Sequence, residues 1–186
     1  VSIKSCLSYT FSVSNSQGAS LIKDRPFTAE MTRSIMLLKE KPYRPRMADY
    51  RIGVFFTGRE QLGEGAKTTA PVYYANRWDI QPSDTAAYLR GEKVKPTKQI
   101  VFYIDNTFPE KWKPYLREGV TQWNELFEQI GFKDVVAAKD FPTDDPEFDP
   151  DNIKYSCVRY APSSIENAMG PSWVDPRSGE ILNASV

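Results

Sequence analysis

Acidic side chains alternate in one short stretch, "PTDDPEFDPDN" at residues 142–152. It places four carboxylates at every second position: Asp145, Glu147, Asp149 and Asp151. Such spacing can bring oxygens together around Ca²⁺, but the EF-hand pattern fails, because Pro150 stands at its sixth position and no Glu stands at its twelfth. We therefore favour a solvated acidic loop, with a calcium site as the minor alternative.

Histidine is absent from all 186 residues. Its absence removes the commonest metal ligand and general base, so no Ser-His-Asp triad, Cys-His pair or His-based zinc site can be built. The two cysteines, Cys6 and Cys157, lie in strand-like stretches, where buried free thiols are favoured over a single disulfide. We predict that the sequence holds no catalytic and no metal-binding residue.

The charge balance argues against two classes of partner. Lys plus Arg and Asp plus Glu each number 24, so the net charge is zero. A protein without net charge has no overall electrostatic field that would attract nucleic acid or an anionic membrane. The basic segment around Arg44 and Arg46 is more consistent with an extended connector than with an anion site. No apolar run approaches the roughly 20 residues of a membrane helix. We expect no nucleic-acid partner and no membrane span.

The elements that would position any site divide into two groups. The first 80 residues carry alternating apolar patterns that predict long antiparallel strands, with a turn at 15–18 and a Gly-rich loop at 58–69. The predicted strands are 1–13, 27–38, 50–56 and 71–80. This region is predicted to be β-rich.

The pattern changes beyond residue 80. A short helix is predicted over 82–92, with Ser83 or Asp84 as N-cap, and the apolar run "IVFYID" at 100–105 is typical of a central strand. Further strands and a closing hairpin follow a long helix. We assign an α+β fold, with a β-rich accessory domain at 1–80, a helix and linker at 81–96, and a second domain at 97–186.

The long helix carries one apolar stripe, which we expect to be buried in the core. Its residues recur at three or four positions, and Gly131 supplies the C-cap. The stripe consists of Trp112, Leu116, Val120, Trp123, Phe127 and Ile130.

Three phrases carry a resemblance to a known family: "KPYRPRMADYRIGVF", the long run from "NRWDIQPSDTAAYLRGE" through "YLREGVTQWNELFEQIGFKDVVAAKD", and "NAMGPSWVDPRSGEI". With them the chain resembles large bacterial zinc-dependent metallopeptidases with a metzincin-like catalytic domain. Residues 1–41 are similar, less distinctively, to the β-rich region before that domain. The resemblance implies the upper half of the domain, a twisted mixed sheet backed by one long helix.

The resemblance also implies an activity and a location. The parent would be a zinc metalloprotease, a hydrolase of peptide bonds that is exported to the periplasm, cell surface or medium. Its zinc-binding HExxH helix would follow the present residues, so Zn²⁺ would belong to the parent and not to this segment. We expect the 186 residues to be an inactive fragment whose partners are a peptide or protein substrate and the C-terminal remainder of its own chain.

One substrate contact follows from the resemblance. The edge strand of such a domain pairs with extended peptide through main-chain hydrogen bonds, and "NAMGPS" is the candidate edge. The substrate-binding residues would be Asn167, Ala168, Met169 and Gly170. A simple bend at Gly170-Pro171, leading into the hairpin, is an equal alternative.

Two further functions stay open. The chain could be a complete, non-catalytic binding module that recruits a partner by strand addition, although its exposed C-terminal strand would then be prone to aggregation. It could also be a calcium-binding adhesion domain, which rests on residues 144–151 alone.

Overall fold

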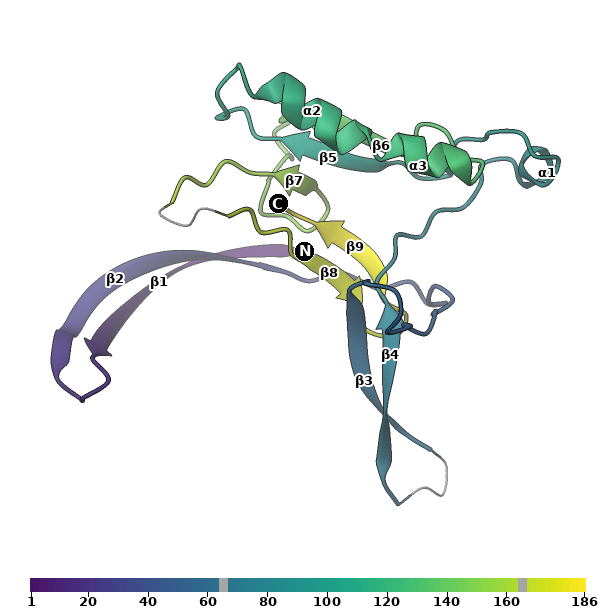
Figure 1. Cartoon of the computed structure of the whole chain (residues 1–186). Coiled ribbons are helices and arrows are strands. Elements are labelled where there is room, and N and C mark those ends of the chain that lie inside the picture. The colour runs from purple at the N-terminus through teal and green to yellow at the C-terminus, as the bar shows by residue number, and fades with distance from the viewer. Residues whose placement is uncertain (64–66, 164–166) are drawn as a thin grey trace. The chain divides into compact units, whose positions relative to one another are not determined.

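The computed structural model describes residues 1–63, 67–163 and 167–186. Its contacts divide the chain into two compact units, Val1–Leu37 and Leu38–Val186. Strands predominate and the helices are few, so the α+β class is confirmed at this level (Figure 1). The domain limits near residues 80 and 96 stay predictions.

The first unit is a two-stranded antiparallel ribbon. β1 (Ser2–Ser14) pairs along its length with β2 (Ser20–Ser34). The predicted turn is confirmed, because the Asn15 side chain accepts the Ala19 N–H at 2.8 Å and Gly18 has φ 82°. β2 begins earlier than the predicted 27–38, since pairing with β1 resumes as soon as this short turn ends. It also ends earlier, at Ser34, which pairs with Ser2, the first residue of β1.

The second unit begins with an irregular connector and a hairpin. β3 (Phe56–Leu62) pairs antiparallel with β4 (Thr69–Ala75). The predicted strand at 50–56 is wrong, because the Asp49 carboxylate accepts the Arg51 N–H and the Asp49 carbonyl accepts the Ile52 N–H, which turns the chain. The predicted loop at 58–69 is instead a strand as far as Leu62.

A parallel sheet forms the centre of the second unit. β5 (Ile100–Ile104) lies between β6 (Val136–Asp140) and β7 (Ser156–Val158), and both neighbours run parallel to it. Ile104 at the end of β5 is fully buried. The apolar run is therefore a central strand, as predicted.

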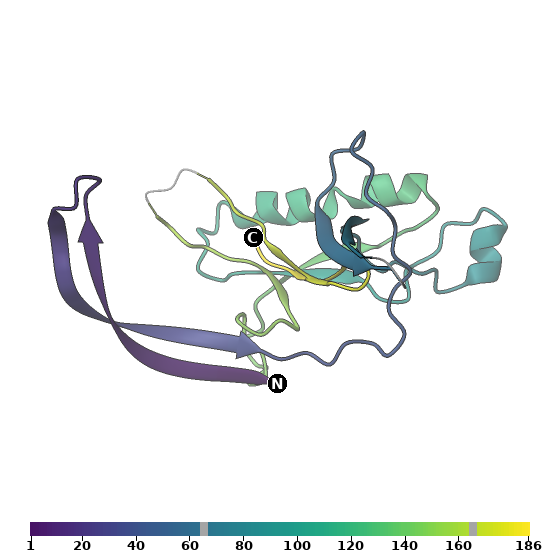
Figure 2. The same cartoon turned by 90° about the horizontal axis from the view of Figure 1, so that it is seen from below.

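A hairpin lies next to this sheet. β8 (Ser172–Asp175) and β9 (Glu180–Ala184) are antiparallel and form a two-stranded sheet of their own. Beyond β9, the Val186 N–H donates to the Cys157 carbonyl at 2.9 Å, and the Arg159 N–H donates to the Val186 carbonyl at 2.7 Å. These two bonds have the parallel pattern and hold the residues after β9 against the end of β7, so the hairpin adjoins the β6-β5-β7 sheet on its β9 side (Figure 1; Figure 2 gives the view from below).

The helices lie between strands in the sequence. α1 (Thr85–Leu89) is capped by Asp84, as predicted. The single long helix is divided into α2 (Lys113–Thr121) and α3 (Asn124–Gln129) by a turn. At this break the Asn124 amide both donates to and accepts from the Val136 backbone, at 2.8 Å each, which anchors the start of α3 to β6. Of the described helices, none is long and apolar enough to cross a membrane.

Candidate functional site

β8 is one strand of the two-stranded hairpin. Within the described residues it pairs with β9 alone. The Ser185 N–H donates to the Pro171 carbonyl at 3.1 Å, whereas the Ala184 N–H turns the other way and donates to Ser156 Oγ at 3.2 Å. Because antiparallel pairs alternate, the backbone groups of Ser172, opposite Ala184, face away from β9. Among the residues that the structure describes, this outer edge of β8 is therefore paired with no strand.

The predicted substrate-binding residues lie directly before this edge. Asn167–Gly170 are exposed and have no regular structure, and Met169 is 69 % exposed. A Cβ on Gly170 would lie 3.3 Å from Val186 Cγ2, which places this segment against the chain beyond β9. The strand itself begins at Ser172, the last residue of the predicted edge "NAMGPS", so the four residues chosen as the substrate site lie before it. Sequence reasoning did not choose Ser172 as a site residue, and it missed Trp173. The "SWVD" run before the Asp-Pro turn was the available signal.

Buried polar groups hold β9 behind the edge strand. Asn183 is 2 % exposed, and its amide donates to the carbonyls of Ile153 at 2.9 Å and Tyr155 at 2.7 Å. Cys157 on β7 is fully buried, and this burial raises the pKa of its thiol to about 11. Both cysteines are free, as predicted, although Cys6 is exposed.

The turn between β8 and β9 is fixed by charged groups. The Arg177 guanidinium donates to the nearly buried Asp175 carboxylate, and this bond keeps the pKa of Asp175 below its ordinary value. A second group involves Lys39, which pairs with Asp79 and Glu180 at 2.7 Å each. Burial opposes the charge of Lys39, but these hydrogen bonds outweigh it and raise its pKa. These two ion pairs link Glu180, at the start of β9, to Lys39 and Asp79 in the irregular segments before and after the β3-β4 hairpin.

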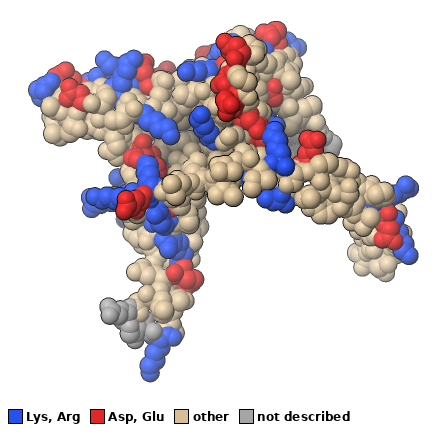
Figure 3. Space-filling view, turned by 180° about the vertical axis from the view of Figure 1, so that it is seen from behind, with Lys and Arg blue, Asp and Glu red and all other residues tan. Residues whose placement is uncertain are grey.

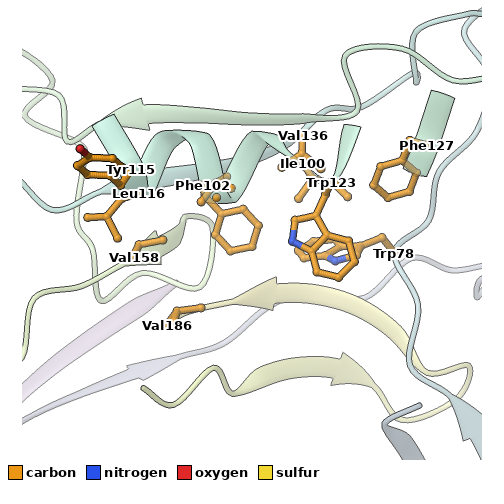
Figure 4. A pocket seen from close by; sticks show the side chains of 12 residues that line it. Trp78, Ile100, Phe102, Tyr115, Leu116, Trp123, Phe127, Val136, Val158 and Val186 are labelled. Atoms are coloured by element: carbon orange, nitrogen blue, oxygen red, sulfur yellow. The ribbon is translucent and has the colours of Figure 1, made fainter. Parts of the chain in front are cut away.

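An open apolar pocket of about 550 Å³ lies between the helices and the sheet (Figure 4). Its floor comes from the strands β5, β6 and β7, with Trp78 and Val186 at its margin. Its helical wall consists of Tyr115, Leu116, Gly119, Val120, Trp123 and Phe127.

The predicted apolar stripe is only partly buried. Leu116, Val120 and Phe127 are half-buried against the pocket and core, but Trp112 and Trp123 are 44 % and 60 % exposed. The expectation of a fully buried stripe is wrong, since the sheet covers only one side of it.

The carboxylates of the acidic loop form hydrogen bonds and an ion pair with nearby residues. Asp145 accepts the Glu147 N–H at 2.9 Å, Asp149 accepts the Asp151 N–H at 3.0 Å, and Arg159 pairs with Asp151. In the part of the chain that the structure describes, no three His, Cys, Asp or Glu side chains are placed to hold a metal ion. Basic and acidic residues are interspersed over the face shown in Figure 3. The calcium alternative stays a prediction.

One family model matches part of the chain. Residues 1–83 match the model of a domain of unknown function, DUF5117. No curated protein and no solved structure matches the chain.

Proposed function

We propose that these residues are the N-terminal portion of a zinc-dependent metalloendopeptidase and supply the strand along which its peptide substrate lies. The edge of β8 that faces away from β9, which is unpaired among the described residues, carries the proposal. An extended peptide can add to such an edge through main-chain hydrogen bonds. The resemblance of "NAMGPSWVDPRSGEI" to the edge of a metzincin-like domain supports the same role.

Under the proposal, neighbouring residues have separate roles. Ser172 offers its outward N–H and C=O to a peptide backbone, and the exposed Asn167–Gly170 segment leads into that edge. Trp173 is 48 % exposed and adds apolar surface beside it. Under this proposal, the contribution of these residues is to bind and orient the substrate.

The parent protein supplies the rest under this proposal. Its zinc ion and general base lie in the C-terminal remainder, where zinc-bound water would hydrolyse the peptide bond. The protein is exported, to the periplasm, the cell surface or the medium. Residues 1–186 alone are inactive.

The edge is tested by removing one donor. In the longer enzyme, Ser172→Pro deletes the outward N–H without touching the β9 ladder, so KM for peptides should rise about threefold to tenfold, the value of one main-chain hydrogen bond. Ser172→Ala keeps the N–H and is the matched control. A KM that is equal in both variants would remove β8 as the substrate strand.

A second candidate is a non-catalytic module that recruits a partner by strand addition. It is favoured by the same edge of β8, because that edge needs no catalytic group to bind a strand. The coding sequence beyond Val186 separates the two functions. An HExxH motif there supports the peptidase, and a stop codon supports the module.

A further inference from the structure

The turn between β8 and β9 is buried, although most of its residues are polar. Asp175, Ser178 and Glu180 are 1 %, 0 % and 5 % exposed. A buried polar group destabilises the fold unless its hydrogen bonds are made, and a buried charge needs a partner of opposite charge. The groups that satisfy this turn therefore decide how firmly the end of β8 is held.

Lys39, in the irregular connector before β3, meets the turn at both of its ends. Its ammonium group pairs with Glu180, the first residue of β9, at 2.7 Å. Its carbonyl accepts a hydrogen bond from the Arg177 guanidinium at 2.8 Å, and the same guanidinium binds Asp175, the last residue of β8, at 2.8 Å. Asp79 also pairs with Lys39 at 2.7 Å, so the ammonium group lies between two carboxylates. One residue thus holds the end of one strand and the start of the other.

The segment after β4 holds the same turn through backbone hydrogen bonds. The Arg77 N–H donates to the Gly179 carbonyl at 2.9 Å, and the Ile181 N–H donates to the Arg77 carbonyl at 2.8 Å. These bonds place Arg77 beside Glu180 in a parallel bridge. Lys39 and Arg77 both lie within the residues that match DUF5117. The matched region therefore supplies groups that hold the turn.

The edge of β8 depends on this attachment because the strand is short. β8 spans Ser172–Asp175. At roughly 3.3 Å per residue its two ends lie about 10 Å apart, so a displaced turn also displaces the outward backbone groups of Ser172. A shift of about 1 Å at a substrate contact is enough to weaken productive binding.

We propose that Lys39 is a positioning residue of the substrate strand: by holding the β8-β9 turn, it sets where the outer edge of β8 presents its backbone groups. The inference rests on the proposed function for the identity of the peptide that binds there. Lys39 acts through Glu180 and Arg177 and does not itself contact the substrate. The region that matches DUF5117 then has a role in this unit, which is to orient the edge.

Peptide kinetics of the longer chain test the positioning role. Lys39→Met should raise KM about tenfold and leave kcat within about twofold of the native value, because the strand that binds substrate moves and the zinc site does not. Lys39→Arg keeps the charge and can donate to both carboxylates, so its KM should return to within about twofold of the native value. Lys93→Met is the matched control, since Lys93 forms an ion pair with Glu128 in which both side chains are about half exposed. Its KM should equal the native value.

A second variant separates positioning from folding. Lys39→Met leaves Glu180 buried without its cation, which destabilises the hairpin by itself. Lys39→Met/Glu180→Gln has no unpaired buried charge, so it should melt close to the native temperature, yet its KM should stay raised because the ionic link to the connector is absent. Amide hydrogen exchange in residues 1–186 gives a readout that needs no activity. In the double variant the Gly179 and Ile181 amides should exchange at least about tenfold faster than in the native chain, while the Ile104 amide in β5 stays protected.

The outcomes separate this inference from the proposed function. Native exchange at Gly179 and Ile181 in the double variant overturns the inference, and so does a native KM in Lys39→Met. A KM for Lys39→Arg as high as that of Lys39→Met also overturns it, because the charge would then not be what positions the strand. If the native longer chain cleaves no peptide, the peptidase is disproved, and the exchange result still decides whether Lys39 holds the turn.

Discussion

At the scale of the residue, the hairpin that carries the edge of β8 depends on a few side chains and one glycine. Gly179 has φ 73°, and a Cβ there would lie 2.7 Å from the Ala75 carbonyl oxygen. The type of this turn was readable from "DPRSG", because Gly is the residue that adopts positive φ freely. The close approach of β4 was not readable, since nothing in the local sequence encodes a contact with residue 75.

Gly179→Ala should lower the free energy of unfolding by about 1–3 kcal/mol, because it adds a steric clash to backbone strain. Gly91→Ala is the control, since Gly91 has φ 86° but no atom within 4 Å of its would-be Cβ. Denaturant melts of both variants measure the difference. Equal losses would show that the clash with Ala75 is relieved at no cost.

The buried Cys157 predicts a dependence on alkaline pH. Burial raises its pKa from 9.0 to about 11, so the folded state keeps the thiol protonated after the unfolded state has ionised. The stability from this group is complete below about pH 9 and is lost as pH rises toward 11. Denaturant melts across this range should show a steeper loss for the native protein than for Cys157→Ala. Parallel curves would contradict the assignment.

At the scale of the element, periodicity predicted most strands but not where they end. The runs at 1–13 and 100–105 are strands, as their apolar spacing predicts. Burial follows the spacing at 100–105 alone, because Ile3, Phe11 and Val13 on β1 are exposed. At 50–56 the same spacing failed, because the Asp49 side chain and carbonyl capture the following N–H groups. The edge role of β8 could be inferred only from the family resemblance, since edge position depends on which distant strand pairs with β9.

The segment before β8 yields a prediction at this scale. Gly170→Val adds a branched side chain where a Cβ alone would lie 3.3 Å from Val186. In the longer enzyme it should raise KM for peptides about fivefold, near 1 kcal/mol, and leave the zinc content unchanged. Peptide hydrolysis and metal analysis of the same preparation provide the test. Unaltered kinetics would favour the simple bend at Gly170-Pro171.

At the scale of the whole molecule, the described residues form two units, and the second contains the parallel sheet, the edge of β8 and the apolar pocket. The order of predicted strands and helices along the chain pointed to the α+β class, which the structure confirms. The expectation that these residues are not catalytic, which rests on the absence of histidine, stays a prediction. The apolar pocket was not predicted, because the sequence of an apolar helical stripe does not show how much of the stripe the sheet will cover.

The most direct test of the account is peptide hydrolysis by the longer chain, compared with residues 1–186 at equal concentration. Casein cleavage should appear in the longer chain, disappear with a zinc chelator and return with added Zn²⁺. Residues 1–186 should show no cleavage under any of these conditions. Chelator-sensitive cleavage by residues 1–186 alone, or a longer chain that binds no zinc and cleaves nothing, would contradict the assignment.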